Sequence, residues 1–191
     1  MFCSRKKREY SNAREQILDA AECVAIEQGT LQLTIDNIAK HAGLSKGGVL
    51  YHFPTKQALV GAVLQRLSAK LMADFMAAYN ALPEGAGRFA KAAIAHMMSP
   101  DADNQFLRVG HVFVAAHIHY PEEFKKAVVN YQSILSLAQT DGLPQEITAI
   151  VVATIDGLCM AELFGIYRYE KPFIAQMRAE LERMIAHATT A

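Results

Sequence analysis

Residues 34–53 contain two helical segments, each too short to be stable alone, and this pairing constrains the fold more than any other feature. We expect Thr34 to cap the first segment and Gly43 to end it after about two turns. We expect Ser45 to cap the second segment, which ends at Pro54 because proline lacks the N–H that a helix needs. Two short helices joined by a glycine-containing turn, here AGLS, are the pattern of a helix-turn-helix.

The rest of the chain also has the helical period. From Asn12 to Gly29, apolar residues recur with the spacing of one helix face, which predicts a third helix for a small N-terminal core. We expect this core to contain Ile17, Val24, Ile35, Ile38, Leu44, Leu50 and Phe53.

Beyond Thr55, loops are expected at residues 82–87, 97–104, 119–123, 140–144 and 169–172. Strand-like alternation is scarce, so we predict an all-α fold of about nine helices. It comprises a three-helix domain with the helix-turn-helix over residues 1–54 and a larger helical domain over residues 55–191.

Charge is balanced over the chain but not along it. Lys and Arg number 19, as do Asp and Glu, while hydrophobic residues make up 52% of the 191 residues. Four basic residues lie together at Arg5–Arg8, as either a solvated tail or an arm that reaches a phosphate backbone. No apolar segment long enough for a signal peptide or a membrane span follows, so we expect a cytoplasmic protein without membrane contact.

The second short helix has a composition that packing alone does not explain. Gly47 and Gly48 in its first turns each cost about 1 kcal/mol relative to alanine. Missing side chains allow a close approach to another surface, and a helix N-terminus attracts anions. We expect Phe53 and Leu50 to face the core, leaving toward DNA the residues Lys46, Gly47, Val49, Tyr51 and His52. A surface hairpin that merely tolerates two glycines in a turn remains the alternative.

The stretch TIDNIAKHAGLSKGGVLYHFPTKQALVGAV resembles the N-terminal signature of the TetR family of transcriptional regulators. The matching positions include Thr34, Gly43, Ser45, Tyr51 and Lys56, and REQILDAA at residues 14–21 fits the first helix of the family. The resemblance covers about residues 12–64, a third of the chain.

The resemblance implies roles for individual residues. Thr34 and Lys56 are expected to touch phosphates of double-stranded DNA, as are Tyr51 and His52. Ser45, Lys46, Gly47 and Gly48 are expected near bases or backbone, with Lys46 as the best candidate for reading a base. Sequence-dependent DNA shape and the Arg5–Arg8 arm are further candidate contributors.

Small residues recur at every fourth position late in the chain, at Ala149, Ala153, Gly157, Ala161 and Gly165. Such a ridge permits a close helix crossing, either within the chain or with a second copy. The resemblance implies the second: a homodimer formed by the last two helices, bound to a pseudo-palindromic operator. The expected dimerisation residues are Ala153, Gly157, Ala161, Gly165, Met177 and Leu181.

A pocket for an unidentified effector is implied by the resemblance. Five residues of the middle helices suit an apolar or aromatic small molecule as a set, although each alone is compatible with plain core: Met97, Phe106, Phe113, His117 and Tyr131. We expect no metal and no cofactor. His117 and His119 point about 200° apart around a helix, and no metal-binding motif occurs.

These observations favour a sequence-specific DNA-binding transcriptional regulator, most simply a repressor released from its operator by a small ligand. An enzyme is not expected, because no nucleophile–base set, paired carboxylates or phosphate loop is present. A helical small-molecule carrier and a helical adaptor that binds only protein are the alternatives. Retention on DNA that falls steeply with salt separates the regulator from both.

Overall fold

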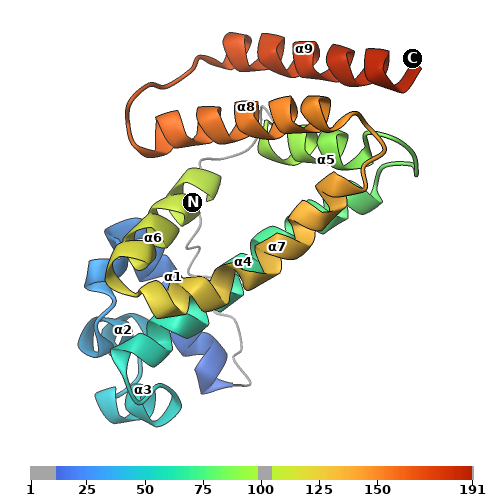
Figure 1. The fold of residues 1–191 in the computed structure, drawn as a ribbon. Coiled ribbons are helices and arrows are strands. Elements are labelled where there is room, and N and C mark those ends of the chain that lie inside the picture. The colour runs from blue at the N-terminus through green and yellow to red at the C-terminus, as the bar shows by residue number, and fades with distance from the viewer. Residues whose placement is uncertain (1–11, 99–104, 191) are drawn as a thin grey trace. The chain divides into compact units, whose positions relative to one another are not determined.

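The structure is a computed structural model that describes residues 12–98 and 105–190. Those residues form nine α-helices and one short 3₁₀ helix and contain no strand (Figure 1). The α-helices are α1 (Ala13–Gln28), α2 (Ile35–Ala42), α3 (Lys46–His52), α4 (Lys56–Asn80), α5 (Arg88–Met97), α6 (Gln105–His119), α7 (Pro121–Gln139), α8 (Gln145–Leu163) and α9 (Lys171–Thr190), and Thr30–Gln32 form the 3₁₀ helix η1. The predicted all-α fold with about nine helices is confirmed.

Local capping explains why the first helices begin and end where they do. The Asn12 side chain accepts a hydrogen bond from the Arg14 N–H at 2.9 Å, and Thr34 Oγ1 accepts one from the Asn37 N–H at 3.2 Å. Gly43 ends α2 in the left-handed conformation, with φ of 67°, which glycine adopts without steric cost. The predicted boundaries of α1 and α2 are therefore confirmed.

The chain forms two compact units. Unit 1 comprises Met1–Ser68 with Arg108–Val129, and unit 2 comprises Ala69–Leu107 with Asn130–Ala191. Helix α4 contributes its first half to unit 1 and its second half to unit 2. The predicted domain boundary lies between residues 54 and 55, before α4, whereas the boundaries of the compact units fall within α4, α6 and α7. A functional boundary between residues 54 and 55 stays a prediction.

Unit 1 has a core built mainly by α1, α2, α3 and the first half of α4. Ile17, Val24, Ile38 and Phe53 are buried as predicted, whereas Ile35 and Leu44 are only partly buried.

One core assignment in α3 is wrong. Val49 is fully buried and Leu50 is 36% exposed, which reverses the prediction for these two residues. Val49 lies one helical turn before the buried Phe53, whose N–H donates to the Val49 carbonyl, so both side chains share the inward face of α3.

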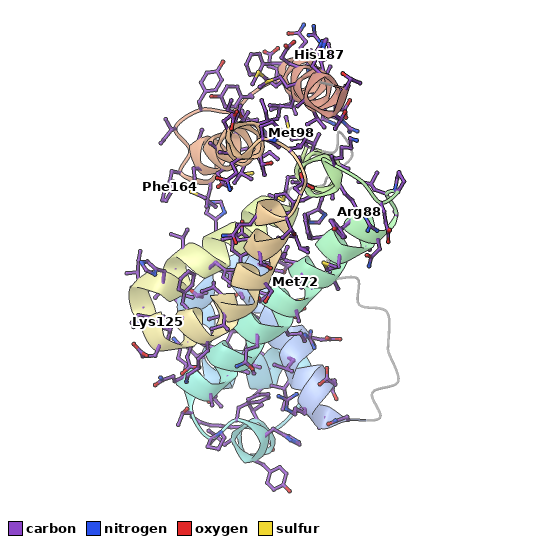
Figure 2. The ribbon with its side chains drawn as sticks, turned by 45° about the vertical axis from the view of Figure 1, so that its right-hand side comes forward. Met72, Arg88, Met98, Lys125, Phe164 and His187 are labelled. Carbon is purple, nitrogen blue, oxygen red and sulfur yellow. The ribbon has the colours of Figure 1, made fainter. Side chains whose placement is uncertain are left out.

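Unit 2 is centred on an apolar cluster to which α5, α8 and α9 contribute (Figure 1). Helix α5 is capped from far along the chain, because the Asp141 carboxylate accepts from the Phe89 N–H at 2.5 Å and from the Ala90 N–H at 3.2 Å. Burial of this carboxyl raises its pKa, and the two backbone hydrogen bonds oppose that change. Figure 2 shows Arg88 where the chain enters α5; its guanidinium lies 4.3 Å from the ring centroid of Tyr79.

Candidate nucleic-acid interface

The N-terminus of α3 is ordered by its own cap and faces solvent. Ser45 Oγ accepts a hydrogen bond from the Gly48 N–H at 3.0 Å, so the predicted cap is confirmed. The hydroxyl hydrogen of Ser45 is not used by this bond and can be donated to an acceptor outside the chain. Lys46 and Gly47 are exposed beside it, as a helix that meets an anionic surface with its N-terminus requires.

The two glycines of α3 are not required by the packing of the protein itself. A β-carbon added at Gly47 would meet only Ser45 Oγ, at 3.9 Å, and one added at Gly48 would meet the same atom at 3.4 Å. Both are ordinary van der Waals distances, and neither glycine has a positive φ. Each glycine destabilises the helix by about 1 kcal/mol relative to alanine. The packing of the protein does not explain why glycine occurs at these two positions.

Tyr51 and His52 form the C-terminal part of the same surface. Tyr51 is 83% exposed, which is unusual for so large a ring. The His52 ring lies against it edge-on, with the centroids 5.0 Å apart. Apart from this contact, Tyr51 is open to solvent.

Thr34 and Lys56 flank α3 at the first turns of α2 and α4. Thr34 Oγ1 is occupied as an acceptor by the cap of α2 and keeps its O–H as a donor. Lys56 Nζ donates to the Leu31 carbonyl at 3.4 Å and lies 5.9 Å from the ring centroid of Tyr120. All eight predicted DNA-contacting residues thus belong to α2, α3, α4 or their caps within unit 1.

One residue of this surface is absent from the sequence prediction. Asp36, in the first turn of α2, pairs with Lys46 at the start of α3, with Lys46 Nζ 2.9 Å from one carboxylate oxygen and 3.0 Å from the other. Both side chains are exposed. The available signal was the helix-turn-helix itself, since its turn can bring the first turns of its two helices together.

The residues predicted to bind an effector are divided between the units. Phe113 and His117 lie in unit 1, where both rings contact Phe124 at centroid distances of 6.3 and 4.9 Å. Met97 packs against the core of unit 2, and Tyr131 is half exposed in the same unit. Phe106 lies on α6, and its side chain is outside what the structure describes. The structure therefore does not bring the five together within one unit.

The residues predicted to dimerise differ in their exposure. Ala153 and Gly157 are exposed on α8, and Ala161 and Met177 are partly buried. Leu181 is buried in the core of unit 2, so it has little surface left for a partner. Gly165 lies after the end of α8 with a φ of 64°, so it does not continue the helical ridge.

Two further properties of the described residues bear on the kind of site. Within residues 12–98 and 105–190, no three His, Cys, Asp or Glu side chains are grouped so that they could hold a metal ion. Within the same ranges, no helix combines the length and apolar character needed to cross a bilayer.

The chain matches two family models. The model "Bacterial regulatory proteins, tetR family" matches residues 17–63, and "Tetracyclin repressor-like, C-terminal domain" matches residues 87–186. The two matches include the candidate interface and more than half of the chain.

Individual proteins are similar to this chain over different lengths. The chain is 39% identical over 67 residues to the transcriptional regulator SrpR of Pseudomonas putida, which is 35% of this chain but only 32% of SrpR. It is 26% identical over 168 residues to the transcriptional regulator BetI of Escherichia coli, covering 83% of this chain and 86% of BetI. The fold is similar to that of the multidrug binding protein EbrR complexed with ethidium, with a TM-score of 0.65, 22% identity and coverage of 91% and 99% of the two chains.

Proposed function

Because the chain belongs to the TetR family of bacterial regulatory proteins and is therefore a regulator and not an enzyme, we propose that it represses transcription by binding a pseudo-palindromic DNA operator. Helix α3 enters the major groove N-terminus first, as recognition helices of helix-turn-helix proteins do. Lys46 reads a base edge, while Thr34, Tyr51, His52 and Lys56 contact phosphates. The protein acts in the bacterial cytoplasm.

The observation that carries this proposal is the unexplained pair of glycines beside exposed polar residues. A side chain at Gly47 or Gly48 would not clash with the rest of the protein. The two glycines therefore leave space for a molecule that approaches α3 from outside. A DNA backbone pressed against α3 uses that space and receives the unpaired N–H groups of the helix. A carrier that uses only an internal pocket gives no reason for glycines at these two positions.

Two copies bind together, each placing α3 in one half of the operator. The exposed face of α8 supports this, because Ile150, Ala153, Gly157 and Met160 follow one another at intervals of three and four residues, and the exposed Phe164 comes next as the C-cap. A two-fold pair places its recognition helices about 34 Å apart, one turn of DNA.

A small apolar or aromatic molecule releases the protein from DNA. Support comes from the exposed or partly buried aromatic side chains of Phe113 on α6 and of Phe124 and Tyr131 on α7. The similarly folded EbrR has been solved with ethidium, an aromatic molecule. A ligand of this class that binds one of two states of the dimer shifts the population away from the DNA-binding state.

Selection of bound sequences from a random DNA pool tests the proposal. We expect the wild-type protein to enrich an inverted repeat. Lys46→Ala should weaken binding to that repeat by about 1–3 kcal/mol, because it removes a base contact. Tyr51→Ala should weaken binding to all duplexes by a similar factor, since a phosphate contact carries no sequence information.

Lys125→Ala is the matched control, because Lys125 is likewise an exposed lysine paired with a carboxylate, that of Glu122, at 2.9 Å. It should leave operator binding unchanged. A folded wild-type protein that enriches no sequence, with and without candidate ligands, would rule out the proposed function.

A further inference from the structure

The candidate interface carries little positive charge. Residues 12–60 contain four basic residues and five acidic ones, a net charge of −1 before the histidines are counted. Only two of the eight proposed DNA-contacting residues are cations, Lys46 and Lys56. Non-specific affinity for DNA comes almost entirely from cations that displace counterions from phosphates. Within the described part of the interface, each of the two lysines therefore contributes a large share of the positive charge.

Lys46 is not a free cation in the unbound protein. Both carboxylate oxygens of Asp36 lie within 3.0 Å of Lys46 Nζ. The two groups are exposed, and they lie at the first turns of α2 and α3, next to the cap residues Thr34 and Ser45. Any duplex that docks on α3 therefore meets a neutralised pair, and a phosphate must compete with a carboxylate for the same ammonium group.

We propose that Asp36 is a specificity-determining residue, which acts through Lys46 to suppress binding to DNA other than the operator. On a random duplex, Lys46 stays paired and the carboxylate faces phosphates that repel it. On the operator, a base-edge acceptor takes Lys46, and the freed carboxylate can accept from an amino group of a neighbouring base. The penalty is thus larger for the wrong sequence. This inference rests on the proposed function as a DNA-binding regulator.

The test compares Asp36→Asn with the wild-type full-length protein on two duplexes of equal length, the selected operator and a random sequence. Affinities are measured over a series of salt concentrations. On random DNA, the released Lys46 should make the slope of log affinity against log salt steeper by about 0.9 for each protomer bound, and so by about 1.8 for the dimer. Affinity for random DNA should rise more than affinity for the operator, so their ratio should fall by roughly tenfold, within the range that one base contact supplies.

Two further variants separate this role from a simple change in net charge. In a Lys46→Ala background, Asp36→Asn should leave the slope on random DNA unchanged, because no ammonium group is released. Glu122→Gln adds the same charge to unit 1 by breaking the exposed pair with Lys125, which Figure 2 labels on α7. It should leave both the slope and the ratio unchanged. Thermal unfolding of Asp36→Asn should match that of the wild type, since an exposed ion pair contributes little to stability.

The possible results distinguish this inference from the proposed function. A wild-type protein that selects an operator, together with an Asp36→Asn variant of unchanged slope and ratio, would overturn the role of Asp36 alone. So would an equal gain in affinity for both duplexes, or a change of slope that persists without Lys46. A folded wild-type protein that selects no operator would overturn the proposed function, and this inference with it.

Discussion

A buried carboxylate shows how one residue can fix the identity of another. The Glu123 side chain accepts a hydrogen bond from Lys126 Nζ at 3.0 Å and one from Gln57 Nε2 at 3.2 Å. These bonds, the one from Lys126 first, lower the pKa of Glu123 although burial acts in the opposite direction. A β-carbon at Gly61 would clash with Glu123 Oε2, so any larger residue there requires the carboxylate to move.

The effect of Gly61→Ala on the free energy of unfolding should therefore change sign when Glu123 is removed. In the wild-type background, alanine forces the Glu123 carboxylate to shift and breaks its bond with Gln57, which we expect to lower the free energy of unfolding by about 0.5–1.5 kcal/mol. In a Glu123→Ala background the space is empty, and alanine should raise it by about 1 kcal/mol through helix propensity. Urea unfolding of the four proteins measures both effects. Equal stabilisation by alanine in both backgrounds would contradict the packing seen at Gly61.

Residue identities near α3 show what the sequence can and cannot predict. Caps such as Asn12, Thr34 and Ser45 are predictable because each bonds to a backbone N–H within three residues. The burial of Val49 instead of Leu50 depends on how α3 rotates against the other helices, which local spacing does not determine.

The pairing of Asp36 with Lys46 is a second such case, because it depends on the geometry of the turn between the helices. Asp141 caps α5 from about fifty residues further along the chain, so no local sequence pattern predicts this cap. The sequence thus predicts the helices of the candidate interface and their caps, but not the pairing of Lys46 with Asp36.

At the scale of elements, Arg66 joins α4 to α1. Its guanidinium lies 3.2 Å from a Glu15 oxygen, 2.5 Å from Asp19 Oδ1 and 2.5 Å from Glu22 Oε1, and the three acids share one face of α1. Partial burial disfavours the charge of Arg66, but the carboxylates outweigh it and raise the arginine pKa. The planar guanidinium can serve several carboxylates at once, which a lysine cannot do with the same geometry.

Arg66→Ala should separate this contact from ordinary surface pairs. Loss of the arginine leaves three carboxylates facing one another, so we expect the free energy of unfolding to fall by about 2 kcal/mol in low salt. Arg183→Ala is the matched control, because its pair with Glu180 is exposed and lies within one turn of α9. It should change stability by less than about 0.5 kcal/mol. Equal effects of the two substitutions in urea unfolding would show that α1 is not held by Arg66.

At the scale of the whole molecule, α8 exposes a row of apolar side chains that nothing in the described chain covers. Met160 is 45% exposed and Phe164 is 59% exposed, and both lie on the same stripe as Ala153. Apolar side chains in a heptad-like row are typical of a helix that packs against another helix. If two copies bind together as proposed, each adds its own phosphate contacts, and the sum raises the affinity for the operator.

Ala153→Arg tests this surface without disturbing the core, since Ala153 is exposed on α8. We expect the variant to remain folded but monomeric in sedimentation experiments, because a charge on the stripe is buried without a partner in the dimer. Its binding to the inverted repeat should then show about half the wild-type dependence of log affinity on log salt, since each protomer displaces the same number of counterions. Ala77→Arg, at an exposed position of α4, should leave both properties unchanged.

A dimeric Ala153→Arg protein would place the contact between protomers elsewhere. A monomeric variant with the full salt dependence would mean that one copy makes all the phosphate contacts.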